Sequence, residues 1–312
     1  MQQRSHVLDT LRSRGAACLS LVSLAMLTAC GGGGGGDSSP ATVSSASSSI
    51  LKYGVAGTVT YTGTHLGNLS VTTTGCRNVA RLTTSPTASS DTTAYYSCTP
   101  SGAYSGTITA ASNGSTLNTQ TFTVSAPIVR MAVSGGGVNG NIDFILKGNV
   151  APITVDNFLD YVNAHFYDGT VFHRVAHFNN PQAGPEYFVV QGGNYTSVTS
   201  GTLPSTPKTA LYNPIKMETT GGTNVQWTAA MARTSDLNSA TSGFFFNVIN
   251  DSAAFDANGT PGYAVFADVS GSASVITAIT QATCTSLAPT GFTDGSCVPI
   301  PNVIVNSATQ IQ

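Results

Sequence analysis

Short runs in which apolar and polar residues alternate dominate the chain between residues 50 and 127. Examples are GTVTYTG, LSVTTTG, GTITAAS and TQTFTVS, and turn-forming residues separate them. An alternation with a period of two is typical of strands that bury one face. We therefore predict that residues 50–127 form a small all-β domain with a sandwich-like arrangement.

Residues 128–312 continue the β pattern with more aromatic residues, as in TVFHRVAHF, EYFVVQGG and FFFNVI. One stretch after Pro152 breaks the alternation, because its apolar residues recur at helical spacing: Val155, Phe158, Leu159 and Val162. Proline is well tolerated in the first turn of a helix. The pattern predicts a mainly antiparallel β fold with a helix near residues 152–164.

The first 29 residues have the pattern of a signal peptide. Arg4, Arg12 and Arg14 precede an apolar run rich in small residues, and this run is too short to span a bilayer. It ends in Leu-Thr-Ala-Cys, which resembles the lipobox of bacterial lipoproteins. The resemblance implies cleavage before Cys30 and lipidation of its thiol. The alternative is an ordinary signal peptide without lipid.

We therefore predict a protein that is lipid-anchored in the bacterial cell envelope. Gly31 rather than Asp follows Cys30, which by the usual sorting rule indicates the outer membrane, with the body facing the periplasm. Residues 30–49 are rich in Gly and Ser, so we expect a flexible tether that does not pack.

Cysteine usage agrees with export. Of six cysteines, one lies in the signal segment and one at position 30, and four remain: Cys76, Cys98, Cys284 and Cys297. Four cysteines allow three pairings. The local pairs 76–98 and 284–297 are expected because each lies inside one predicted domain, and an oxidising compartment favours disulfides. A metal site is the alternative, but no Cys-x-x-Cys or suitably spaced His is present.

Composition excludes some classes of function. Only 8% of the residues are charged and the formal net charge is −2, which gives no electrostatic basis for binding nucleic acid. No apolar run is long enough for a membrane-spanning helix.

The order of several motifs in residues 128–312 resembles the cyclophilin-type peptidyl-prolyl isomerases of the periplasmic bacterial branch. The matching segments are GNIDFIL, APITVDNFLDYVNAHFYDGTVFHRV, YFVVQGGNYT, NPIKMET, AAMARTSDLNSATSGFFFNV and GYAVFADV. The resemblance implies a closed eight-stranded antiparallel barrel capped by two helices. It also implies an isomerase that acts on proline-containing polypeptides, here exported proteins, without a cofactor or metal. We expect a monomer.

Arg174 matches the main catalytic residue of this family. Rotation about a peptide bond costs about 18–20 kcal/mol because resonance is lost. The proline nitrogen regains its lone pair in the twisted state, and a guanidinium aimed at it stabilises that state selectively. His173 is expected to be structural, because strand alternation points it away from Arg174.

By the same resemblance, eight residues bind the substrate: Phe188, Val189, Gln191, Ala232, Arg233, Phe245, Phe255 and Tyr263. The apolar ones line the proline pocket, Gln191 orients the arginine, and the pair at 232–233 lies on the strand edge beside the substrate backbone. Phe255 matches only loosely, because the family's Trp-Leu-Asp or Phe-Leu-Asp motif is altered here.

Three more features depart from the family. Residues 175–187 contain an insert that covers the site or changes access to it, and Gly243 replaces a glutamine that contacts the substrate backbone. The Cys284–Cys297 loop is an added elaboration. We expect weak activity on short peptides and poor cyclosporin affinity.

Two other functions stay open at this stage. One is a module that binds proline-containing segments, as a chaperone does, with little turnover. The other is a structural lipoprotein in which the domain at 50–127 acts, and that domain is a spacer, an interaction module or a binder of sugar or peptidoglycan.

Overall fold

The computed structural model describes residues 39–50, 52–102, 104–180, 184–199, 202–204, 207–218, 222–256, 262–287 and 295–312. These residues belong to one compact unit, Asp37–Gln312. The predicted signal peptide and Cys30 lie outside the described residues. Within the described ranges, no helix combines the length and apolar character that crossing a membrane requires.

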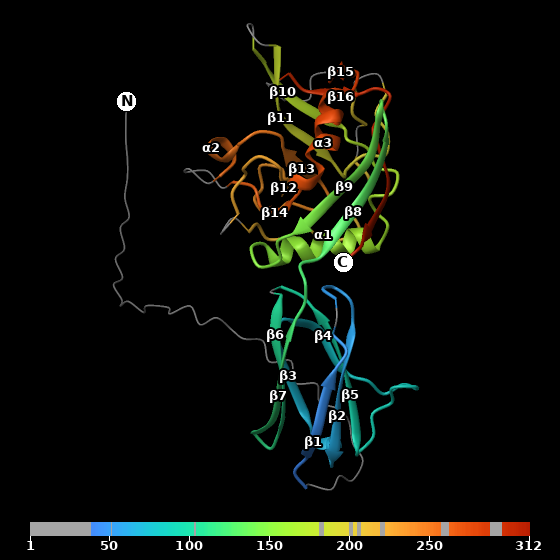
Figure 1. The fold of residues 1–312 in the computed structure, drawn as a ribbon, viewed down its shortest axis with the longest axis vertical. Helices are drawn as coiled ribbons and strands as arrows, with labels where there is room; N and C mark the ends of the chain where they lie inside the picture. Colours follow the sequence, from blue (N-terminus) through green and yellow to red (C-terminus); the bar gives the residue numbers. More distant parts are fainter. Residues whose placement is uncertain are drawn as a thin grey trace, which may run out of the picture. The chain divides into compact units, whose positions relative to one another are not determined.

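Two antiparallel sheets make up the part of the chain before residue 128 (Figure 1). The first has the order β1-β2-β5-β4, with bounds Thr42–Ser48, Gly57–Thr64, Thr93–Pro100 and Cys76–Arg81. The second has the order β3-β6-β7, with bounds Ser70–Thr74, Ser105–Ser112 and Ser115–Thr123, and a short 3-10 helix covers Leu66–Asn68. Val59, Tyr61 and Ile108 point inward and are buried.

The predicted tether, residues 30–49, extends too far along the chain. Its C-terminal part forms β1, which pairs with β2 in antiparallel register from Thr42↔Thr64 to Ser48↔Val59. Strand pairing uses backbone groups, so a Ser-rich segment can join a sheet where a few apolar side chains anchor it. Val43 and Ala46 supply these anchors by packing against the core.

Ten antiparallel strands form a larger sheet after residue 127, in the order β15-β16-β10-β11-β13-β12-β14-β9-β8-β17. Their bounds in chain order are β8 Ile128–Gly135, β9 Val138–Leu146, β10 Arg174–Asn180, β11 Gly184–Gly192, β12 Thr228–Met231, β13 Phe244–Asn247, β14 Val265–Asp268, β15 Cys284–Ser286, β16 Cys297–Pro299 and β17 Ile304–Gln310. The prediction of a mainly β chain is confirmed, while the domain boundary at 127/128 stays a prediction.

The strands in the described part of the chain do not close into the expected eight-stranded barrel. The sheet has two ends, β15 and β17, and the Cys284–Cys297 loop adds β15 and β16 to it. Beside β17 the chain makes isolated contacts instead of a ladder: a bridge from Val171 to Ile304 and a hydrogen bond from Phe172 N to Val303 O of 3.0 Å. The irregular backbone before β10 therefore replaces the strand pairing that would close a barrel.

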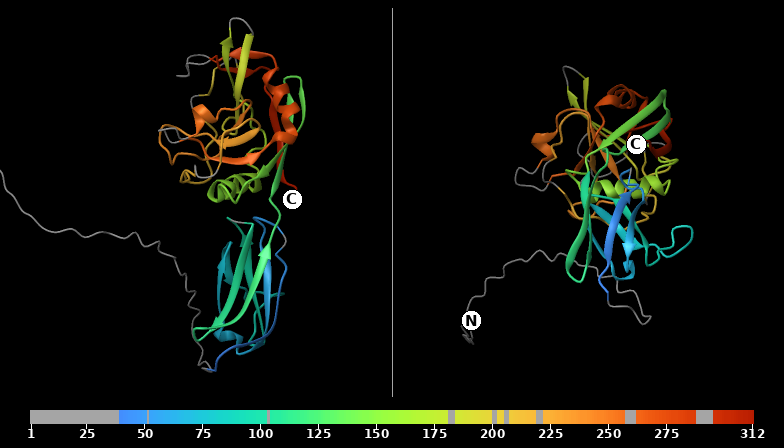
Figure 2. Two further views of the ribbon diagram at one scale, coloured as in Figure 1. Left: turned by 60° about the vertical axis from the view of Figure 1, so that its left-hand side comes forward. Right: turned by 60° about the horizontal axis from the view of Figure 1, so that its bottom comes forward.

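Two longer helices pack on this sheet: α1 (Pro152–Asn163) and α3 (Ala273–Thr280), the latter preceded by a 3-10 turn at Ser270–Ser272. Figure 2 shows α3 alongside the β8–β9 hairpin. The helix predicted near 152–164 is confirmed. The four apolar residues at helical spacing are 0–2% exposed: Val155, Phe158, Leu159 and Val162. Phe158 of α1 lies 5.1 Å from Phe144 and 4.8 Å from Phe266 between ring centroids, so aromatic packing fixes the helix on the sheet.

Both predicted disulfides are present. Cys76 pairs with Cys98 at a Cα–Cα distance of 5.4 Å, and Cys284 pairs with Cys297 at 5.6 Å. The prediction of local pairing is confirmed.

A buried polar cluster lies behind the short helix α2 (Ser252–Phe255). The side-chain amide of Asn224 donates to Asp256 Oδ1 at 2.8 Å and to Phe255 O at 3.2 Å, and Asn247 Nδ2 donates to Asn224 Oδ1 at 3.2 Å. Asp251 is only 7% exposed, and its Oδ2 has no hydrogen-bond partner among the described residues. This burial raises the pKa of the Asp251 carboxyl from 3.8 to about 7.

We predict that Asp251→Asn stabilises the chain at alkaline pH. Between pH 3.8 and about 7 the folded chain holds a proton that the unfolded chain has lost, so stability falls as pH rises through this window. The variant lacks this titration, so its advantage in unfolding free energy should grow from near zero at acid pH to at most about 4 kcal/mol at pH 8. Urea unfolding at several pH values measures it. A difference in unfolding free energy that does not change with pH contradicts the prediction.

Candidate functional site

Eight of the nine residues predicted to act on the substrate line one groove of about 140 Å³: Arg174, Val189, Gln191, Ala232, Arg233, Phe245, Phe255 and Tyr263. They come from β10, β11, β13 and the segments that follow β12 and precede β14. The β10–β11 ladder places Arg174 directly opposite Gln191, and β11–β13 pairing places Gln191 opposite Phe245. Strand register alone thus assembles the central residues.

The half-buried Arg174 guanidinium is held at two of its nitrogens. Nη1 donates to Gln191 Oε1 at 3.2 Å, and Nε donates to Ser296 Oγ at 2.8 Å. The Gln191 contact agrees with the orienting role expected from the sequence. Ser296 was not predicted, because it belongs to the added loop, and only its position next to Cys297 distinguishes it in the sequence.

Three aromatic rings form the apolar wall of the groove. Phe245 is 4% exposed and meets Phe255 and Tyr263 edge-on, with centroids 5.6 and 5.2 Å apart. Phe255 and Tyr263 also contact each other at 5.2 Å, and the Arg233 guanidinium lies 4.6 Å above the Tyr263 ring. The altered motif around Phe255 therefore still supplies an aromatic side chain to the wall.

Phe188 is the one predicted residue that does not line the groove. It is 6% exposed and belongs to the same apolar cluster as Val189 and Phe245, which do line the groove. A β-bulge explains this position, since Ala176 pairs with Val189 and His177 with Tyr187, which leaves Phe188 as the extra residue.

The segment after β12 differs in detail from the expected edge. The Ala232 N–H donates to Gly243 O at 2.9 Å, so this amide is engaged inside the protein. At Gly243 an added Cβ would lie 2.1 Å from Asn194 Oδ1. The Asn194 carboxamide thus occupies the space that a longer side chain at position 243 would need.

The insert at residues 175–187 lengthens β10 and β11 into a projecting hairpin (Figure 1). Register continues to Asn180↔Gly184. Among its described residues, none lines the groove. The insert was expected either to cover the groove or to change access to it. Its described residues do not cover the groove.

His173 is 3% exposed and packs edge-on against Tyr195 at 4.7 Å. Burial lowers the pKa of its imidazole to about 3, so the ring is neutral at physiological pH. Its position is that expected for a structural residue.

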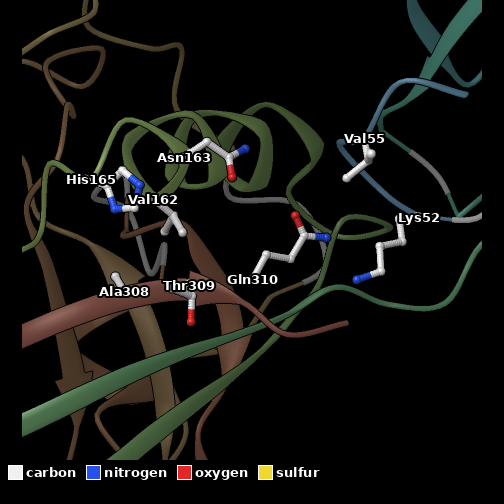
Figure 3. A pocket seen from close by; sticks show the side chains of 8 residues that line it. All are labelled: Lys52, Val55, Val162, Asn163, His165, Ala308, Thr309 and Gln310. Atoms are coloured by element: carbon white, nitrogen blue, oxygen red, sulfur yellow. The ribbon is translucent and has the colours of Figure 1, made fainter.

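A second cavity, of about 280 Å³, contains none of the predicted site residues: it is lined by Lys52, Val55, Val162, Asn163, His165, Ala308, Thr309 and Gln310 (Figure 3). It has no aromatic wall. Across the described ranges, no group of three His, Cys, Asp or Glu residues is arranged to hold a metal.

Comparison with known proteins identifies the family. The family model described as "Cyclophilin type peptidyl-prolyl cis-trans isomerase/CLD" matches residues 128–310, more than half of the chain. "Peptidyl-prolyl cis-trans isomerase A" of Dickeya dadantii is 36% identical over 174 residues, which cover 55% of this chain and 80% of the relative. "Peptidyl-prolyl cis-trans isomerase cyp18" of Streptomyces antibioticus is 37% identical over 174 residues, which cover 54% and 92%.

"Peptidyl-prolyl cis-trans isomerase B" of Escherichia coli is 39% identical over 133 residues, which cover 41% of this chain and 71% of the relative. The segment before residue 128 lies outside the family match. The groove, the matched segment and these relatives agree: the chain belongs to the cyclophilin-type peptidyl-prolyl cis-trans isomerases and is an enzyme of that class.

Proposed function

We propose that Arg174 catalyses the isomerisation of X–Pro bonds in exported polypeptides bound in this groove. The observation that carries the proposal is that the guanidinium, fixed by Gln191, shares the groove with the Phe245–Phe255–Tyr263 wall. A proline ring against the wall places its imide nitrogen toward the cation.

The chemistry follows from charge and burial. In the planar ground state the imide nitrogen shares its lone pair with the carbonyl, so it is a poor hydrogen-bond acceptor. When the bond twists, the lone pair returns to nitrogen and can accept a hydrogen bond from Arg174. The guanidinium stays charged at any relevant pH and is half-buried, which strengthens its interaction with the lone pair. The twisted state therefore gains more than the ground state.

We predict that Arg174→Ala lowers kcat/KM about 100- to 1000-fold, which is typical of the loss of one preorganised donor. Arg174→Lys should recover little, because an ammonium lacks the planar fork that Gln191 orients. A protease-coupled assay on a proline tetrapeptide measures both variants. Arg130→Ala is the matched control, since Arg130 forms a partly exposed ion pair with Asp143 at 2.7 Å, outside the groove. Equal rates for Arg174→Ala and the wild type would refute the proposal.

A second function is a module that binds proline segments with little turnover. The specific observation in its favour is Gly243, which has no side chain to contact the substrate backbone. The Asn194 carboxamide occupies the space that such a side chain would need. The same assay separates the two functions, because a binding module gives peptide binding at the groove without acceleration above the uncatalysed rate.

We also propose that the enzyme is lipid-anchored through Cys30 in the bacterial cell envelope, at the outer membrane and facing the periplasm. The signal-like N-terminus ending in Leu-Thr-Ala-Cys supports this, and the two disulfides agree with an oxidising compartment. Its substrates there would be newly exported chains.

We predict that cells expressing the full chain incorporate labelled palmitate into it and that Cys30→Ser abolishes the label. The variant should also leave the membrane fraction, because acyl chains supply most of the membrane affinity of such an anchor. Cys18→Ser, in the segment that is removed, is the matched control and should retain the label. Persistent labelling of Cys30→Ser would rule out this anchor.

A further inference from the structure

The loop closed by the Cys284–Cys297 disulfide reaches the strand that carries Arg174. Within the loop, β15 pairs with β16 from Cys284↔Pro299 to Ser286↔Cys297. Strand β16 in turn pairs with β10 at Val175↔Cys297. Cys297 is thus fixed both covalently and by sheet pairing, beside the residue that follows Arg174.

Ser296, directly before this anchored cysteine, is 6% exposed. Its Oγ accepts the Arg174 Nε–H at 2.8 Å, while Gln191 Oε1 accepts from Nη1 at 3.2 Å. A guanidinium is planar, so acceptors at two different nitrogens fix the orientation of its plane as well as its position. Gln191 lies on β11 and Ser296 directly precedes β16, and these two strands flank β10. Hydrogen bonds from two sides therefore hold the Arg174 guanidinium.

We propose that Ser296 is a positioning residue for Arg174 and that the Cys284–Cys297 disulfide keeps it in place. This inference rests on the proposed catalytic role of Arg174. The contact orients the guanidinium before substrate binds, so its loss affects the twisted state more than ground-state binding.

Ser296→Ala should lower kcat on the proline tetrapeptide about 3- to 10-fold, as expected for the loss of one hydrogen bond, with little change in KM. Ser296→Thr keeps the acceptor oxygen and should restore most of the rate. Ser286→Ala removes an exposed hydroxyl from the facing strand β15 and should behave as wild type. The Nε–H resonance of Arg174 in a ¹⁵N spectrum should shift in Ser296→Ala and not in Ser286→Ala.

A double-mutant cycle separates this inference from the proposed function. In an Arg174→Ala background, Ser296→Ala should have no further effect. If Arg174→Ala itself leaves the rate unchanged, the proposed function fails. If Arg174→Ala is impaired but Ser296→Ala matches Ser286→Ala in rate and spectrum, only the role of Ser296 is refuted.

The disulfide is tested by replacing both Cys284 and Cys297 with Ala in the full chain. The rate should fall at least as far as in Ser296→Ala, with the same change at the Arg174 Nε–H resonance. The matched control replaces Cys76 and Cys98, which lie before residue 128, and should keep the rate. An unchanged Nε–H resonance in the first pair, with near-UV circular dichroism showing a folded chain, would overturn the part assigned to the disulfide.

Phe178 is an independent feature, an exposed aromatic side chain on the hairpin formed by the insert. It is 55% exposed, and its ring stacks on Phe188 with centroids 4.4 Å apart and planes 14° apart. Alternation along β10 puts Arg174, Ala176 and Phe178 on the same face, and Ala176 and Phe188 belong to the apolar cluster that includes the groove residues Val189 and Phe245. Phe178, stacked on Phe188, therefore exposes an apolar ring next to this cluster.

We infer that Phe178 forms an additional subsite for an apolar side chain of the bound polypeptide. Four residues of strand span about 13 Å, so an extended substrate would reach Phe178 about four residues from its proline. A tetrapeptide is too short to do so. The occupant is thus a longer unfolded chain, which also rests on the proposed function of the groove.

Phe178→Ser should raise KM about 3- to 10-fold for an eleven-residue peptide with Leu four positions before or after the proline, through lost apolar contact. The tetrapeptide rate and the KM of peptides with Ser at those positions should not change. Leu211→Ser is the matched control, because Leu211 is similarly exposed, at 53%, and lies outside the groove and hairpin. An equal rise in KM for every peptide, or no rise for the Leu peptides, would refute the subsite. Unchanged turnover of the tetrapeptide by Phe178→Ser would show that the groove itself is intact.

Discussion

The proposed function depends on one arrangement of hydrogen bonds: the guanidinium of Arg174 donates to Gln191 and to Ser296. Fixing the orientation of a flexible arginine side chain during each reaction would cost conformational entropy and so reduce the stabilisation of the twisted state. Here Gln191 and Ser296 already fix that orientation in the folded protein. The neighbouring His173 does not line the groove, and its imidazole is neutral and packs on Tyr195.

The register of the paired strands sets the positions of the groove side chains. The bulge at Phe188 adds one apolar residue to the cluster that includes the groove wall. The Asn224 side chain donates hydrogen bonds to the backbone carbonyl of Phe255 and to the side chain of Asp256. Aromatic packing of α1 on the sheet supplies the rigidity that these contacts need. The regular elements therefore fix the groove residues, while the disulfide loop contributes the Ser296 contact to Arg174.

Much of this was visible in the sequence, because local patterns encode local structure. The helical spacing after Pro152 predicts α1. The motif Phe172-His173-Arg174 predicts the arginine, and the other matched segments predict most of the residues that share its groove. Long-range pairing was not encoded in this way. The prediction of a closed barrel is wrong because the chain beside β17 makes isolated backbone contacts instead of a strand ladder. The sequence does not predict β1 because its Ser-rich composition resembles that of a linker. Ser296 was missed since it meets Arg174 across 122 positions.

The most direct test is a structure of the chain with a bound proline-containing peptide. The account predicts the proline ring against Phe245 and Tyr263, with the imide nitrogen within about 3.5 Å of the Arg174 guanidinium, as hydrogen bonding requires. A peptide bound instead in the cavity beside Lys52 and His165, or in the groove with Arg174 turned away from the imide, would contradict it.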